Sequence, residues 1–178
     1  GRPFADISPK DWSYGSVNSA SCYDLMNGRG KSEFAPNGTL TVAESITLAV
    51  RIHAKYYGKT IPSYDGGAWY DGYVSYALQN GIYADGPYDI PATREVFARI
   101  LAAALPEKEL WDNGSSVSFA DEDQIRYRSS VELLCQAGVI NGTKRGGQTF
   151  FDPNDTITRA QAAAIITRMV IPDNRTHS

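Results

Sequence analysis

Hydrophobic and polar positions recur along this chain at a constant interval of 57 residues. Trp12, Trp69 and Arg126 are spaced by this interval (12 to 69 and 69 to 126), and aligning them brings further apolar columns into register. These columns are Val17, Val74 and Val131; Ala20, Ala77 and Leu134; and Leu25, Ile82 and Val139. A fixed period of this length indicates an array of related supersecondary units.

Each unit is expected to begin with a helix that buries one face. Apolar positions at offsets of three, four and seven residues mark such a face, most clearly in the segment 70–78. Glycine and asparagine, which tolerate the left-handed backbone that closes a helix, follow each of these segments. The closing turns are Asn27-Gly28, Asn80-Gly81 with Asp85-Gly86, and Gly138 with Asn141-Gly142.

A second helix follows in each unit, after a loop that contains proline. Thr41 and Thr158 are followed three residues later by Glu44 and Gln161, which predicts a capping box, whereas Thr93 has no such partner. A single pair of helices would expose too much apolar surface to stand alone, so the units must share one core. We therefore predict an all-α fold of three helix-loop-helix units, 4–57, 58–108 with a shortened loop, and 109–171, followed by a tail, 172–178.

Composition narrows the classes of function. The formal net charge of −3 argues against nucleic-acid binding, which needs a basic surface to neutralise phosphates. The sequence has no apolar run of about 18 residues, so we predict no membrane span. Cys22 and Cys135 have no spacing typical of zinc or of a disulfide framework, and we interpret them as buried thiols, with a long-range disulfide left open.

Candidate chemistry for catalysis is sparse. His53 and His177 are the only imidazoles, and the acidic residues form no pair whose spacing suggests glycoside hydrolysis. The acidic turns lack the alternating oxygen ligands of a calcium loop. We predict no catalytic residue, no metal site and no cofactor.

The combined motifs resemble the S-layer homology repeat of bacterial surface proteins. Its opening Phe-x-Asp matches Phe4-Ala5-Asp6 and Phe119-Ala120-Asp121, and its Phe-x-Pro loop matches Phe34-Ala35-Pro36 and Phe151-Asp152-Pro153. Its glycine turn and its Thr-Arg-Ala-Glu helix start match the segments given above, so that the resemblance extends from Phe4 to Met169. Three positions depart from the pattern: Val42 replaces the arginine, Arg126 replaces the tryptophan, and Glu95 follows Thr93-Arg94 directly.

The resemblance implies a function as well as an arrangement. Three such repeats form a pseudo-threefold structure around a shared helical bundle, and the grooves between repeats hold a secondary cell-wall polysaccharide, in many members anionic and pyruvylated. We therefore expect an extracellular, non-enzymatic module that anchors a surface protein to a Gram-positive cell wall. A self-association module of a surface-protein lattice and a part of a carbohydrate-active enzyme are the alternatives.

Two arginines are the strongest candidates for ligand contact. Arg94 and Arg159 directly follow the capping residues Thr93 and Thr158, where a cation opposes the positive end of the helix dipole. In one interpretation each exposed arginine, with the free amides of the first turn, clamps an anion. In the other it pairs with a nearby acid such as Asp152 or Asp155.

The remaining candidates have equally open interpretations. Trp12 and Trp69 either stack against a sugar ring or act as packing wedges between helices. Gly28 and Gly142 either let a ligand approach the backbone or only close a turn. Arg51 and Arg168, ten residues beyond the capping threonines, either line a groove or are solvated.

Overall fold

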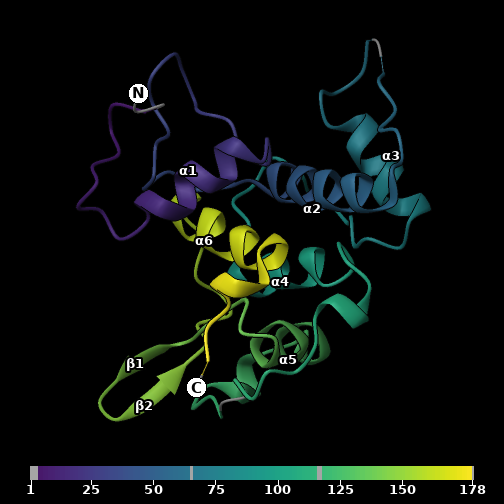
Figure 1. The fold of residues 1–178 in the computed structure, drawn as a ribbon. Coiled ribbons are helices and arrows are strands. Elements are labelled where there is room, and N and C mark those ends of the chain that lie inside the picture. Colours follow the sequence, from purple (N-terminus) through teal and green to yellow (C-terminus); the bar gives the residue numbers. More distant parts are fainter. Residues whose placement is uncertain (1–3, 65, 116–117, 178) are drawn as a thin grey trace.

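The computed structural model describes residues 4–64, 66–115 and 118–177, and the described part is mostly helical (Figure 1). Its helices are α1 (Tyr14–Cys22), α2 (Val42–Tyr57), α3 (Asp71–Gln79), α4 (Arg94–Leu101), α5 (Arg128–Gln136) and α6 (Arg159–Val170). Three short 3-10 turns, η1 (Glu107–Glu109), η2 (Glu122–Gln124) and η3 (Pro172–Asn174), lie in the connections. In the described residues, none of these helices has the length and apolar character needed to cross a membrane.

The prediction of a purely helical fold is wrong at one place. Strands β1 (Thr143–Arg145) and β2 (Gln148–Phe150) form an antiparallel hairpin that projects from the body at the lower left of Figure 1. Its two turn residues, Gly146 and Gly147, both have positive φ angles, 55° and 78°. Two consecutive left-handed residues are what a type I′ hairpin turn requires, and two glycines supply them without steric cost.

A closed ring of backbone hydrogen bonds lies where the second helices begin. The amide of Leu40 donates to the carbonyl of Ile157 (3.2 Å), that of Ile157 to Ala92 (3.1 Å), and that of Ala92 back to Leu40 (2.7 Å). All three side chains are buried. Because each of these residues stands one position before a capping threonine, the ring gathers the starts of α2, α4 and α6 around one centre.

The helices pair across the predicted units. Helix α3 packs against α2, α5 against α4, and α1 against α6, while α2 also contacts α4. The apolar columns of the 57-residue period are buried in this arrangement, with the exception of Val74, which is half-buried. The first and last helices of the chain are therefore neighbours, and the array closes on itself.

The two cysteines are free thiols in different surroundings. Cys135 is buried, and burial raises the pKa of its thiol to about 12. Cys22 is exposed at the end of α1, so the interpretation of both as buried thiols is wrong for this residue.

Candidate ligand-binding grooves

The predicted caps shape the starts of the second helices. The Thr41 hydroxyl accepts from the Glu44 amide (3.1 Å) and the Glu44 carboxylate from the Thr41 amide (3.0 Å), and Thr158 and Gln161 repeat the arrangement. Thr93 accepts from the Val96 amide alone (3.4 Å), as its lack of a partner predicts. Thr93 and Thr158 thus act as helix caps, and a role for them in ligand binding stays a prediction.

An aspartate from each Phe-x-Asp motif holds a Phe-x-Pro loop in a strained conformation. Asp6 accepts from the amides of Phe34 and Ala35, both at 2.8 Å, and Asp121 accepts in the same way from Phe151 and Asp152. Ala35 has a φ of 58° and Asp152 one of 56°, which side chains rarely adopt. Burial alone would raise the pKa of Asp6, but the amides of Phe34 and Ala35, its own amide and the charge of Arg159 together lower it.

The helix-start arginines reach from one predicted unit into another. Arg159 donates from Nε to the carbonyl of Phe34 (2.7 Å) and from Nη2 to that of Asn27 (2.6 Å). Arg94 donates from Nε to the carbonyl of Phe151 (2.9 Å) and from Nη2 to that of Asn141 (2.7 Å). Each arginine therefore joins a helix start to a glycine turn and a proline loop.

These contacts correct two expectations about the arginines. Arg159 is only 4% exposed, whereas an exposed side chain was expected. Asp152 and Asp155 are not the ion-pair partners, because the Asp152 carboxylate binds Arg145 (2.8 and 2.9 Å) and Asp155 offers Arg94 a backbone carbonyl. Arg159 does pair with a nearby acid, since its Nη1 lies 3.9 Å from the Glu44 carboxylate. A guanidinium carries five N–H donors, and two bonds to carbonyls leave donors for a ligand.

Two matching grooves form beside these arginines. The α2 groove, of about 200 Å³, contains Arg159, Asn27, Gly28, Trp69 and Arg51. The α6 groove, of about 290 Å³, contains Arg94, Asn141, Gly142, Trp12 and Arg168 in the corresponding places. The structure thus brings six of the predicted site residues together as two sets of one arginine, one glycine and one tryptophan.

The tryptophans stand at the rims of the grooves. Trp12 is 69% exposed and Trp69 60% exposed, so the interpretation of either as a packing wedge is wrong. Trp69 makes edge contacts with Tyr70 and Tyr73, with ring centroids 5.5 and 6.3 Å apart. Exposed indole faces beside a guanidinium are suited to stacking against a sugar ring.

The groove glycines are required for packing rather than for a left-handed turn. The residues with positive φ after the first helices are Asp24, Gly81 and Gly138, which again keep the 57-residue interval. A Cβ atom on Gly28 would lie 2.7 Å from the Phe4 ring, and one on Gly142 would lie 2.7 Å from the Phe119 ring. The expectation of left-handed backbone at Gly28 and Gly142 is therefore wrong.

Arg51 and Arg168 line the grooves and are not free in solvent. Arg51 donates to the carbonyl of Leu25 (3.1 Å) and Arg168 to that of Val139 (3.5 Å). Each guanidinium adds a positive charge to its groove. Of the two interpretations of Arg51 and Arg168, that they line a groove or that they are solvated, the structure favours the first.

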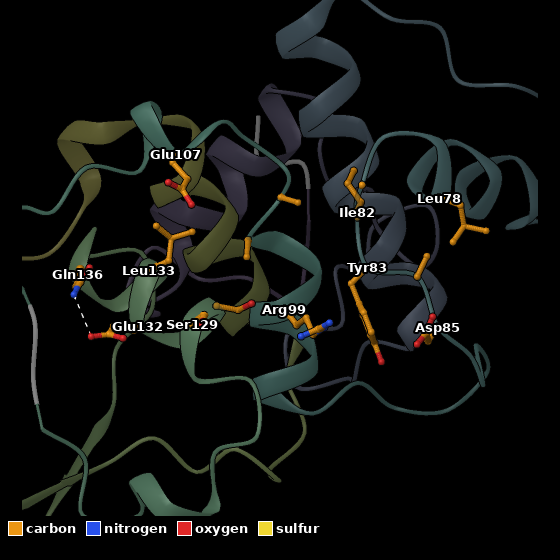
Figure 2. A pocket seen from close by; sticks show the side chains of 15 residues that line it. Leu78, Ile82, Tyr83, Asp85, Arg99, Glu107, Ser129, Glu132, Leu133 and Gln136 are labelled. Atoms are coloured by element: carbon orange, nitrogen blue, oxygen red, sulfur yellow. Dashed lines mark hydrogen bonds between the residues drawn. The ribbon is translucent and has the colours of Figure 1, made fainter.

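A third seam, which we call the α4 groove, has different chemistry (Figure 2). In the alignment of the motifs, Val42 replaces the helix-start arginine, Asp85 the groove glycine and Arg126 the tryptophan, and of these three Asp85 lines the groove. The Tyr88 hydroxyl donates to the carbonyl of Ala84 (2.9 Å), which corresponds to the asparagine carbonyls bound by arginine in the other grooves. In the α4 groove a neutral phenol thus binds the carbonyl that a guanidinium binds in the other two grooves.

The α4 groove is also larger in volume and has an acidic lining. It measures about 830 Å³ and is lined by the carboxylates of Asp85, Glu107 and Glu132. Figure 2 shows Arg99 between the two walls, and its guanidinium lies 4.7 Å from the Tyr83 ring and 4.5 Å from the Tyr127 ring. Its acidic lining disfavours an anionic ligand.

The buried Glu95, which departs from the motif, ties this seam together. Its carboxylate is fully buried and accepts from the amides of Arg126 (2.9 Å) and Tyr127 (3.1 Å), with the Arg126 guanidinium at 3.5 Å. The start of α5 is thereby fixed to α4. Among the described residues, no three His, Cys, Asp or Glu side chains gather as a metal site would require.

Comparison with known proteins agrees with these motifs. The family model of the S-layer homology domain matches residues 3–44 and 118–163. The chain is 27% identical to the Surface-layer 125 kDa protein of Lysinibacillus sphaericus, over 82% of this chain and 13% of that protein. It is 25% identical to the S-layer protein sap of Bacillus anthracis, over 94% of this chain and 21% of that protein.

Similarity also extends to an enzyme. The chain is 27% identical to the Amylopullulanase of Thermoanaerobacterium thermosulfurigenes, over 93% of this chain and 9% of that protein. The chain thus spans about a fifth or less of the length of these three relatives.

Proposed function

Because this chain belongs to the S-layer homology domain family, we propose that it anchors a bacterial surface protein to the cell envelope by binding an anionic wall polysaccharide in the α2 and α6 grooves. The family and the surface-layer relatives indicate the bacterial cell surface as its location. Attachment is non-covalent, and the chain acts in it as a binding module without chemistry of its own.

The matched composition of the two grooves is the observation that carries the proposal. Each groove combines a helix-start guanidinium with a second one, Arg159 with Arg51 or Arg94 with Arg168, and one exposed tryptophan. The α2 groove has Arg29 in addition. A charge-assisted hydrogen bond contributes about 1.5–3 kcal/mol, and a tryptophan face complements the apolar face of a pyranose. An acidic sugar unit uses both features at once.

We also propose that the chain consists of three repeats, 4–57, 58–108 and 109–171, arranged with pseudo-threefold symmetry. The hydrogen-bonded ring of Leu40, Ala92 and Ile157 and the cyclic pairing of helices support this division. The family model matches parts of the first and third repeats, and the second repeat is the one that departs most from the motifs.

Sedimentation with purified cell walls tests the anchoring function. The domain is expected to pellet with intact walls and to stay in solution with walls stripped of their secondary polymer. Trp12→Ala combined with Trp69→Ala is expected to prevent pelleting, because it removes both stacking faces. Arg99→Ala, in the α4 groove, is the matched control and should pellet like the native chain.

Two outcomes would contradict the proposal. Equal pelleting with intact and stripped walls would mean that the secondary polymer is not the ligand. Equal pelleting of the double tryptophan variant would mean that the two grooves are not the site. The surface-layer relatives support self-association as a second candidate, which would gain support from concentration-dependent oligomers formed without walls.

A further inference from the structure

Another cavity, which we call the helix-end cavity, lies beyond the α2 and α6 grooves, toward the carboxyl ends of the second helices. It measures about 350 Å³ and is formed by the turn after α1, the last turns of α2 and α6, and the turns η1 and η3. Much of its wall comes from apolar side chains that belong to the core, namely Leu25, Ile52, Leu105 and Met169. A mainly apolar cavity of this volume with a few polar groups is typical of a site for a small molecule.

Arg175 lines the helix-end cavity and carries a donor without a partner. Its Nε donates to the carbonyl of Arg168 (2.9 Å) and its Nη2 to that of Met169 (3.1 Å). Its guanidinium also lies 4.6 Å from the ring centroid of Trp111. The remaining nitrogen, Nη1, is buried and has no hydrogen-bond partner in the described part of the chain. Buried donors in folded proteins are nearly always paired, so this one indicates an acceptor from outside the chain.

The charged side chains around the helix-end cavity leave an excess of one positive charge. Its described wall contains two cations, Lys55 and Arg175, and one carboxylate, Glu109, so that two minus one gives +1. The Glu109 carboxylate accepts from the Tyr56 hydroxyl (3.0 Å), and among the described residues no carboxylate lies in ion-pairing range of Arg175. Lys55 donates to the carbonyl of Tyr23. A ligand with one negative charge complements this wall.

We propose that the helix-end cavity is a second binding site, which takes a small molecule with an apolar body and one carboxylate. The carboxylate accepts from Nη1 of Arg175, because charge-assisted bonds to guanidinium are among the strongest hydrogen bonds in proteins. The apolar body packs against Leu25, Ile52 and Met169. Since Nη1 is closed to bulk water in this structure, a side chain of the wall shifts when the ligand enters, and the unbranched Met169 is suited to adapt. This site is separate from the wall-polymer grooves.

Tryptophan fluorescence with three probes tests the proposal. In the Trp12→Ala/Trp69→Ala variant Trp111 is the remaining tryptophan, and its contact with Arg175 makes it a reporter for this cavity. The probes are octanoate, 1-octanol, which has the chain without the charge, and acetate, which has the charge without the chain. In parallel, the melting temperature of the native chain is measured with each probe, because a ligand that binds the folded state stabilises it.

The expected results separate the charge from the apolar body. Octanoate should change the fluorescence saturably, raise the melting temperature, and bind at least about tenfold more tightly than either other probe. Arg175→Gln should weaken binding of octanoate about tenfold and change binding of 1-octanol less than about threefold. Val170→Phe, which enlarges a side chain of the wall and keeps Arg175, should weaken both. Lys108→Gln, at an exposed residue beside Glu109 that is not part of the wall, is the matched control and should bind like its parent.

Two results would overturn the proposal. Octanoate that has no saturable effect, or that binds no more tightly than 1-octanol, would mean that an ordered water alone satisfies Nη1 of Arg175. Unchanged binding of octanoate by Val170→Phe would place the acid at another site. Where loss of the contacts to α6 prevents Arg175→Gln from folding, the comparison of probes and Val170→Phe still decide. The assay contains no cell walls, so its outcome is independent of the anchoring function.

Discussion

At the scale of single residues, the helix-start arginines stabilise the fold and also supply positive charge to the grooves. Arg159→Ala would leave the buried carbonyl of Phe34 and the part-buried carbonyl of Asn27 without their donor. An unsatisfied buried acceptor costs about 1–3 kcal/mol, so the free energy of unfolding should fall by at least that amount in a urea titration. Trp69→Ala is the control and should stay within about 0.5 kcal/mol of the native chain. An unchanged midpoint for Arg159→Ala would contradict the assigned contacts.

His53 gives the fold a dependence on pH. Its Nδ1 lies 2.7 Å from the Tyr76 hydroxyl, and burial, with a smaller effect of Lys59, lowers its pKa below 6.5. As pH falls through about 6.5 the unfolded chain binds a proton that the folded chain does not yet bind, so stability decreases. The melting temperature of the native chain should therefore fall more between pH 7.5 and 5.5 than that of His53→Gln. Equal decreases would mean that another group causes the effect.

The distance between partners decides which residue roles could be predicted from the sequence. The capping boxes were confirmed because Thr41 and Glu44 are three residues apart, within one turn of helix. The role of Arg159 was missed because its carbonyl partners lie 125 and 132 positions away in the chain. Apolar periodicity indicates which face of a helix is buried. Trp69 precedes α3, so this periodicity does not predict that its side chain is exposed.

At the scale of elements, the glycine turns fix the grooves through close packing. A Cβ atom on Gly142 would lie 2.6 Å from the Phe150 carbonyl oxygen and 2.7 Å from the Phe119 ring, so Gly142→Ala should displace the turn. We expect a loss of stability of about 1–3 kcal/mol, typical of overpacking. Gly15→Ala, in helix α1 with open space at its Cβ, should instead stabilise by up to about 1 kcal/mol. Thermal unfolding is the test: the melting temperature should fall for Gly142→Ala and rise for Gly15→Ala. Shifts of the same sign in both variants would contradict this expectation.

The elements themselves were predictable to the extent that their signals are local. The six helices of the described residues lie in the segments where periodicity and caps place them, whereas the sequence analysis predicts a loop where the hairpin of β1 and β2 forms. Its sequence signal was present, because Gly146-Gly147 stands between β-forming Thr and Phe residues. Strands of three residues are too short for an alternating pattern to stand out, so only the turn could have revealed them.

At the scale of the whole molecule, the sequence period identifies the units but leaves their packing partners open. A buried stripe on α3 is the same whether the helix packs against α4 of its own unit or against α2 of the preceding one. The structure shows the second arrangement for α3 and α5, and α1 completes the cycle against α6. The grooves follow from this exchange, since each combines a helix start, a glycine turn and a tryptophan from three different units.

Closure of the cycle also makes the fold indivisible. In a linear array the removal of a terminal unit costs one interface and leaves the others folded. Here a fragment of residues 58–178 would lose the partners of both α3 and α6 and one member of the central hydrogen-bonded ring. We expect this fragment to show no cooperative thermal transition by circular dichroism, and to regain one when a fragment of residues 1–57 is added. A sharp transition of the isolated fragment near the melting temperature of the full chain would show that the units are held in series and not in a closed cycle.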